Sequence, residues 1–147
     1  MTKSILRVEK IGGTSMSRFK EVMQNVLVKD HKDVTNRIIV VSAYDGVTNA
    51  LLEHKKTRQP GIYTLFAEQK EFRPELNKLK EKLFEINASF KNIKLDVDAA
   101  NDYIDKKINR ASEYLNSMED VLSSGYLKLS DILLAAREML ASIGESH

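Results

Sequence analysis

The sequence predicts an α/β fold built on a parallel sheet, incomplete as it stands and carrying a helical insertion. Three observations predict it: an apolar strand that stops at Gly12-Gly13, a second apolar run at 38–41, and apolar residues at helical spacing between the two. This order is typical of a β-α-β unit with a right-handed crossover. Two parallel strands do not form a self-sufficient sheet, so we expect the fold to need further strands.

The helix between the two strands is expected to begin after Ser17, a predicted N-cap. The second strand is continuously β-branched over 38–41, which predicts a strand buried on both faces. The apolar positions of the helix follow the i, i+3, i+4 spacing of a helix that packs one face on a core. They are Phe19, Val22, Met23, Val26 and Leu27.

Beyond residue 60, leucine and isoleucine residues alternate three and four apart. This spacing predicts two antiparallel helices at about 75–91 and 97–123. A shorter helix at about 61–72 is expected to precede them and to end at Pro74. Gly125 is the expected C-cap of the longest helix.

A final helix is expected to be capped at its start by Ser130 and to end at Gly144, which leaves Glu145 just beyond it. The predicted organisation is a β-α-β unit at 1–58, a helical insertion at 59–126 and this last helix at 127–147. The predicted buried face of the last helix comprises Ile132, Ala135, Ala136, Met139, Leu140 and Ile143.

Composition limits the classes of protein that this chain can be. It has 147 residues, 42% of them hydrophobic and 30% charged, as in a single globular domain. A net charge of +2 is too small to favour nucleic acid or an anionic membrane as the main partner. The absence of cysteine excludes disulfides and cysteine-ligated zinc. With no apolar run of spanning length and no signal peptide, a cytoplasmic protein is expected, and the sequence predicts no metal-ligating residues.

The loop after the first strand, "EKIGGTSM", combines a lysine, two glycines and two hydroxyls. Glycines let a backbone approach an anion closely, and successive N–H groups form an anion-binding concavity. Lys10 would add a point charge, and Thr14 and Ser15 would add hydroxyl donors. Neither the common P-loop nor the dinucleotide fingerprint is present. A tight strand-to-helix turn with an exposed lysine is the alternative explanation.

The loop after the second strand, "SAYDGVTN", has a similar plan. Ligands bind outside the carboxyl ends of parallel strands, so Lys10–Ser15 and Ser42–Thr48 are expected to lie side by side at one edge. Local capping and a turn at Asp45-Gly46 would explain this loop by itself. They would not explain why two such loops occur at neighbouring strand ends.

Three motifs in order resemble the aspartate kinases of the amino acid kinase superfamily. They are "VEKIGGTSM", "VVSAYDGVTNALLE" and "LSDILLAAREMLASIGES". The combination looks most like aspartate kinases associated with ectoine synthesis. Ile11 stands where the family usually has phenylalanine, and Tyr44-Asp45 departs from a segment that is more often small or methionine-containing.

The resemblance implies an amino acid kinase-like sandwich that uses MgATP to phosphorylate the β-carboxylate of L-aspartate. It assigns Lys10 as the catalytic residue at the transferring phosphates, and Ser42 and Thr48 to the aspartate side. Glu145 would hold the substrate's ammonium group, although a solvated charge past a helix end is the alternative. The phosphate loop would consist of Lys10, Gly12, Gly13, Thr14 and Ser15.

By the same resemblance the chain is the N-terminal portion of a longer catalytic domain, expected to be inactive alone and homo-oligomeric as a full-length protein. Two other functions remain open. One is a related kinase that acts on another amino acid or on a nucleotide monophosphate. The other is a non-enzymatic domain that binds phosphate or a partner.

Overall fold

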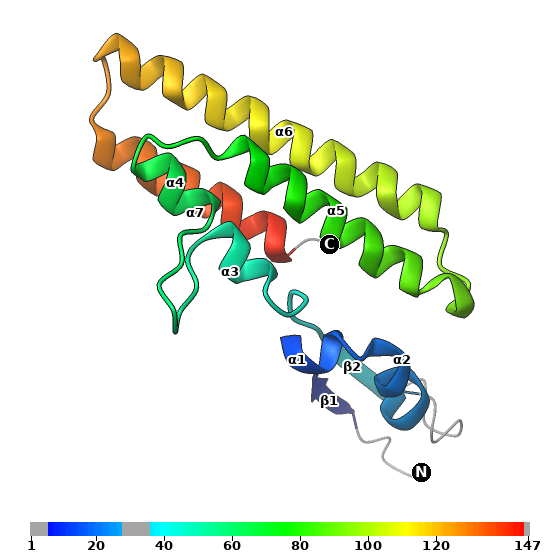
Figure 1. The fold of residues 1–147 in the computed structure, drawn as a ribbon. Helices are drawn as coiled ribbons and strands as arrows, with labels where there is room; N and C mark the ends of the chain where they lie inside the picture. The colour runs from blue at the N-terminus through cyan, green and yellow to red at the C-terminus, as the bar shows by residue number, and fades with distance from the viewer. Residues whose placement is uncertain (1–5, 28–35, 146–147) are drawn as a thin grey trace. The chain divides into compact units, whose positions relative to one another are not determined.

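The computed structural model describes residues 6–27 and 36–145, with the side chains of 26, 27 and 145 excepted. The chain folds as two compact units, Met1–Asp45 and Gly46–His147, which we call the N-terminal unit and the helical unit (Figure 1). Among the described residues, no helix combines the length and apolar character that crossing a bilayer requires.

The N-terminal unit is a strand–helix–strand arrangement with parallel strands, as predicted. The strands pair in register from Arg7 opposite Arg37 to Lys10 opposite Val40. The Ile11 N–H extends the ladder by donating to the Val40 carbonyl at 2.8 Å. Its elements are β1 (Arg7–Lys10), α1 (Gly13–Met16), α2 (Phe19–Val22), the π-helix η1 (Met23–Leu27) and β2 (Arg37–Val40).

An ion pair that no sequence motif predicts joins the two strands. The Arg37 guanidinium pairs with the Glu9 carboxylate, and the Arg37 side chain is only 7% exposed. Removal of Glu9 would leave this buried cation without that counter-charge, so the pair helps to fix the register of the sheet.

The helix predicted to begin after Ser17 begins at Phe19, as α2, but it is irregular, because α2 runs directly into the π-helix η1. The N-cap predicted at Ser17 is wrong, because a separate turn, α1, precedes α2 and Ser17 is the C-cap of that turn. The Ser17 hydroxyl donates to the Gly13 carbonyl and accepts from the Asp45 N–H, both at 3.3 Å. It is therefore engaged with the chain after β2 and does not cap α2, whose N-cap is Arg18.

The predicted burial of the second strand on both faces is also wrong for this chain. Residues 38–41 are 40–55% exposed. The described sheet has two strands, and no helix packs extensively on either of them. The β-branched run therefore pairs as expected but is not covered.

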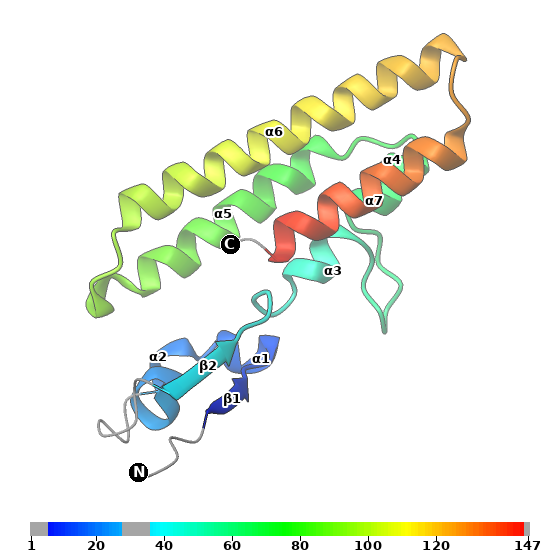
Figure 2. The same ribbon diagram turned by 180° about the vertical axis from the view of Figure 1, so that it is seen from behind.

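The helical unit is dominated by an antiparallel hairpin of two long helices, with a third helix alongside (Figures 1 and 2). The predicted hairpin helices are confirmed to within two residues at each end. The elements are α3 (Val47–Leu51), α4 (Ile62–Ala67), α5 (Arg73–Ser89), the 3₁₀ turn η3 (Lys91–Ile93), α6 (Val97–Ser124) and α7 (Leu129–Glu145).

The core of the helical unit forms where the apolar stripes of α5, α6 and α7 meet. Four of the six residues predicted to be buried on α7 are buried, but Ala135 is exposed and Met139 is half-buried. The stripes repeat every three or four residues, as helix packing requires. They comprise Leu76, Leu79 and Leu83 on α5, Ile104, Ile108, Ala111 and Leu115 on α6, and Ile132, Ala136, Leu140 and Ile143 on α7.

Several helix ends differ from those predicted. Pro74 opens α5, where a missing N–H costs nothing, and does not end the helix before it. Ser130 lies inside α7, and so does Gly144, because α7 runs through to Glu145. Gly125 is confirmed as the C-cap of α6, with φ of 73°.

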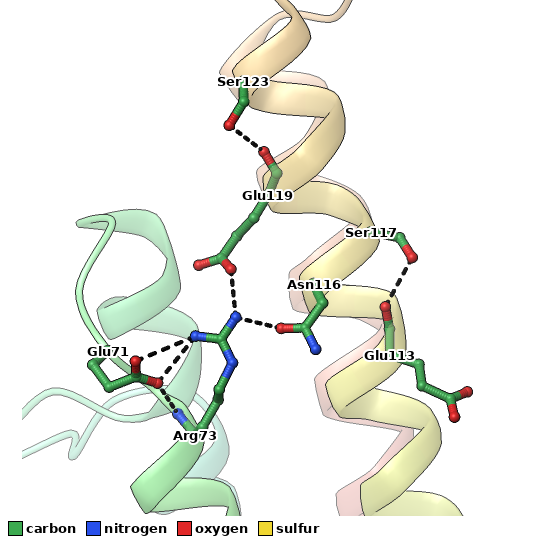
Figure 3. Close-up of polar contacts among 7 residues, drawn as sticks. All are labelled: Glu71, Arg73, Glu113, Asn116, Ser117, Glu119 and Ser123. Atoms are coloured by element: carbon green, nitrogen blue, oxygen red, sulfur yellow. Dashed lines mark hydrogen bonds and ion pairs between the residues drawn. The ribbon is translucent and has the colours of Figure 1, made fainter.

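Arg73 links the start of α5 to α6 through a set of polar contacts (Figure 3). Its guanidinium contacts Glu71 at 3.1 Å and Glu119 on α6 at 2.8 Å, and it also bonds Asn116. The Arg73 N–H donates to Glu71 at 3.0 Å. The two kinds of bond from Arg73 to Glu71 lower the pKa of Glu71 from its usual 4.5. The backbone N–H has the larger effect on this pKa and the guanidinium the next largest.

The lowered Glu71 pKa predicts a contribution to acid stability. The folded chain binds this proton less readily than the unfolded chain, so the stabilisation is present above about pH 4.5 and is lost as pH falls through the lowered pKa. Glu71→Gln should therefore shrink the loss of unfolding free energy between pH 6 and pH 3, measured by urea titration. Glu68→Gln is the control, because among the described residues the Glu68 carboxylate pairs with exposed Lys70 alone. Equal acid profiles for wild type and Glu71→Gln would contradict the prediction.

Candidate phosphate-binding loop

The loop after β1 places a lysine and two hydroxyls in solvent at the carboxyl end of the strand. Lys10 is the last residue of β1 and is exposed, whereas Ile11 is buried and tied to β2. Gly12 follows as the N-cap of α1, and Thr14 and Ser15 are exposed in its single turn. Burial of Ile11 thus anchors the loop and leaves its polar groups free to meet a ligand.

The same turn presents backbone donors. Its first intrahelical bonds run from the Met16 N–H to the Gly12 carbonyl at 2.9 Å and from the Ser17 N–H to the Gly13 carbonyl at 3.1 Å. The N–H groups of 13–15 precede those bonds and so have no carbonyl partner within the helix. Because α1 is a single turn, its dipole adds little, and an anion would be held by these N–H groups and by Lys10.

Gly13 brings the loop against the segment that follows β2. A Cβ built on Gly13 would lie 2.9 Å from the Ala43 carbonyl oxygen, closer than side chains approach backbone atoms. The Asp45 N–H also reaches the Ser17 hydroxyl at 3.3 Å. Within the N-terminal unit the two strand-end segments therefore lie side by side, as the parallel pairing predicted.

The residues of the second segment have different environments. Ser42 is exposed, and Asp45 is exposed at the turn. Tyr44, a departure from the family pattern, is half-buried, and burial raises the pKa of its phenol above 10.0. Tyr44 therefore remains uncharged at neutral pH and adds no negative charge beside the loop.

Thr48 and Glu145, the other predicted substrate residues, belong to the helical unit. Thr48 is exposed on α3, which begins after Gly46 with φ of 77°. Glu145 is the last residue of α7. Helices α3 and α7 pack against each other, so these two residues lie on neighbouring elements. A pocket that combines them with the Lys10–Ser15 loop stays a prediction.

The donors of the loop suit the phosphates of a nucleotide. Lysine, backbone N–H and hydroxyl groups bind phosphate oxygens, whereas Mg²⁺ requires oxygen ligands, chiefly carboxylates and the phosphates themselves. Over the part of the chain that the structure describes, no three His, Asp or Glu residues form a metal-binding group.

Fold and loop together define a parallel strand–loop–helix unit whose exposed donors suit a phosphate group. Among curated proteins, the chain is similar to the aspartate kinase Ask_Ect of Stutzerimonas stutzeri (strain A1501), with 43% identity over 145 residues, 95% of this chain. The chain is thus similar in sequence to an aspartate kinase, which confirms the resemblance drawn from its three motifs. It spans about 30% of the length of that relative. No protein-family model and no solved structure matches the chain.

The two glycines of the loop should respond differently to a methyl group. Gly13→Ala should lower the free energy of unfolding by about 1–3 kcal/mol, because its Cβ meets the Ala43 carbonyl. Gly12→Ala should change it by less than about 0.5 kcal/mol, because nothing lies within 4 Å of its Cβ and its φ of −79° suits any residue. Chemical denaturation of the two variants measures this. Equal stabilities would contradict the described approach of the two segments.

Proposed function

We propose that this chain is the phosphate-binding part of an aspartate kinase, which transfers a phosphoryl group from MgATP to the β-carboxylate of L-aspartate. The single observation that carries the proposal is the 43% identity to an aspartate kinase over 95% of the chain. The exposed donors of the Lys10–Ser15 loop give that identity a chemical rationale.

The proposed reaction needs no covalent intermediate with the protein. The aspartate carboxylate is already ionised at neutral pH, so catalysis reduces to alignment and to neutralising charge on the phosphates. Lys10 would place its ammonium group on the transferring phosphate, while the N–H groups of 13–15 and the hydroxyls of Thr14 and Ser15 hold phosphate oxygens. Magnesium would supply further charge neutralisation when bound.

The proposed substrate side comprises Ser42, Thr48 and Glu145. A carboxylate such as that of Glu145 suits the α-ammonium group of an amino acid, and the hydroxyls suit its carboxylates. In this division of roles the cationic Lys10–Ser15 loop binds the nucleotide, and anionic Glu145 binds the ammonium group of the amino acid. A cytoplasmic location would provide both substrates.

A chimera tests the proposal directly. This chain would replace the 145 matched residues of Ask_Ect from Stutzerimonas stutzeri, and acyl phosphate would be trapped with hydroxylamine. We expect product with L-aspartate, and with L-glutamate at least about tenfold less, because a longer side chain misplaces the carboxylate. Glutamate as the better substrate would favour a different kinase. A folded chimera without activity would favour a binding domain that is not an enzyme.

A further inference from the structure

A hollow between α6 and α7 has features of a second ligand site. Its volume is about 170 Å³. None of the described residues that line it is acidic, and two are cationic. Four residues come from α6 and three from α7: Lys107, Arg110, Ala111, Tyr114, Met139, Ser142 and Ile143.

The two cations of this hollow differ from their neighbours on the hairpin. Lys106 pairs with Asp102 at 2.5 Å, and Lys80 of α5 pairs with Asp105 at 3.0 Å. Among the described residues, neither Lys107 nor Arg110 has a carboxylate partner.

Each of these two cations instead lies over a tyrosine ring. The Lys107 ammonium is 5.4 Å from the centre of the Tyr103 ring, and the Arg110 guanidinium is 5.3 Å from that of Tyr114. The rings orient the two charges without neutralising them. Lys107 and Arg110 therefore place two positive charges beside one hollow.

Hydrogen bonds at the hollow leave several donors available on the α6 side. Arg110 Nε donates to the Tyr114 hydroxyl oxygen at 2.8 Å, so the Tyr114 O–H proton remains available. The Lys107 ammonium retains its three N–H donors. Across the hollow, Ser142 donates to the Met139 carbonyl at 2.7 Å. Ala111 and Ile143 are buried and give the hollow an apolar floor.

We propose that this hollow binds a small oxyanion, a phosphate or a carboxylate group, through Lys107, Arg110 and the Tyr114 hydroxyl. Two cations that have no carboxylate partner among the described residues line the hollow together with the tyrosine that carries the O–H donor, and charge-assisted bonds to such an anion are the strongest that these groups form. The site lies wholly within the helical unit and does not depend on the Lys10 loop. The rival explanation is that the two cations stabilise the carbonyl end of α7, close to Ser142 and Ile143.

Backbone NMR of the ¹⁵N-labelled chain tests the proposal, with inorganic phosphate, succinate and chloride titrated at constant ionic strength. Saturable shifts at 107–114 and 139–143 are expected with phosphate, succinate or both, and chloride should give none. Phosphate alone would identify a phosphate site, and succinate alone a carboxylate site. The absence of saturable shifts with both oxyanions would overturn the proposal.

Charge-matched variants complete the test. Lys107→Met and Arg110→Met should each weaken binding about tenfold or more, and Tyr114→Phe, which keeps the ring, should weaken it severalfold. Lys106→Met removes the same charge one residue away and should bind within twofold of wild type. Equal weakening by Lys106→Met and Lys107→Met would show diffuse attraction and overturn the site. The rival explanation is that the cations stabilise the end of α7. It would be established if the wild type bound no oxyanion and Lys107→Met lowered the melting temperature.

Discussion

Lys10→Met is expected to lower aspartyl phosphate formation by the Ask_Ect chimera about a thousandfold, the scale on which removal of a single charge-stabilising donor slows an enzyme. Lys10 is exposed at the end of β1, beside a turn whose N–H groups have no partner within the helix. The loss should fall mainly on kcat, because charge on the transferring phosphate develops in the transition state.

Lys20→Met is the matched control for this prediction. Lys20 is exposed on α2 in the same unit, and its replacement removes the same charge. Activity within about twofold of wild type is expected for it, as for most exposed substitutions. If Lys10→Met and Lys20→Met lost activity equally, the loss would come from the change in net charge or from misfolding. The role proposed for Lys10 would then be wrong.

Gly61→Ala is expected to have the largest effect on stability, lowering the free energy of unfolding by about 2–4 kcal/mol. A Cβ at Gly61 would lie 2.5 Å from the Leu52 carbonyl oxygen and 2.7 Å from that of Asn49. The Gly61 N–H also donates to the Leu52 carbonyl at 3.2 Å, as does the Thr64 hydroxyl at 2.9 Å. A methyl group therefore has to separate the start of α4 from the end of α3.

Urea denaturation followed by circular dichroism at 222 nm measures this loss, because the helical unit supplies most of the helix. Gly125→Ala is the control for backbone strain alone. Gly125 has φ of 73°, but nothing lies within 4 Å of its Cβ. It should cost about 1 kcal/mol, the penalty for a left-handed residue with a side chain. A Gly61→Ala variant no less stable than Gly125→Ala would contradict the close approach of α3 and α4.

The helical hairpin could be predicted from the sequence because its signal is repetitive. Ile104, Ile108, Ala111 and Leu115 recur at three- and four-residue spacing, and all four are buried. Parallel pairing of the two strands was equally predictable, since a helix-length segment separates two apolar runs. The hairpin and the strand pairing were predictable because each is indicated by many residues of a repeated local pattern.

Helix ends were less predictable because single hydroxyls can serve several purposes. Ser17 and Ser130 both look like N-caps, yet one binds the segment after β2 and the other lies inside α7. Pro74 belongs to the first turn of α5 and not to the end of the helix before it, since proline suits a first turn as well as a break. Each of these outcomes is decided by tertiary contacts that a local motif does not contain.

For the candidate site, the sequence names candidate residues but does not show the environment of each. Gly12 and Gly13 look equivalent in the motif, although only Gly13 is required for the close approach to Ala43. Exposure of the second strand could not be foreseen either, because β-branched composition indicates the preference for burial and not whether another element covers the strand. The cations at Lys107 and Arg110 carry no motif, and only the packed helices show that neither pairs with a carboxylate of the described residues.

A crystal structure of the chimera with a non-hydrolysable ATP analogue would probe the nucleotide assignment most directly. Phosphate oxygens should be found about 3 Å from Lys10 Nζ and from the N–H groups of residues 13–15. A nucleotide whose phosphates sit elsewhere, with Lys10 left in solvent, would refute the idea that the first strand ends in a phosphate cradle.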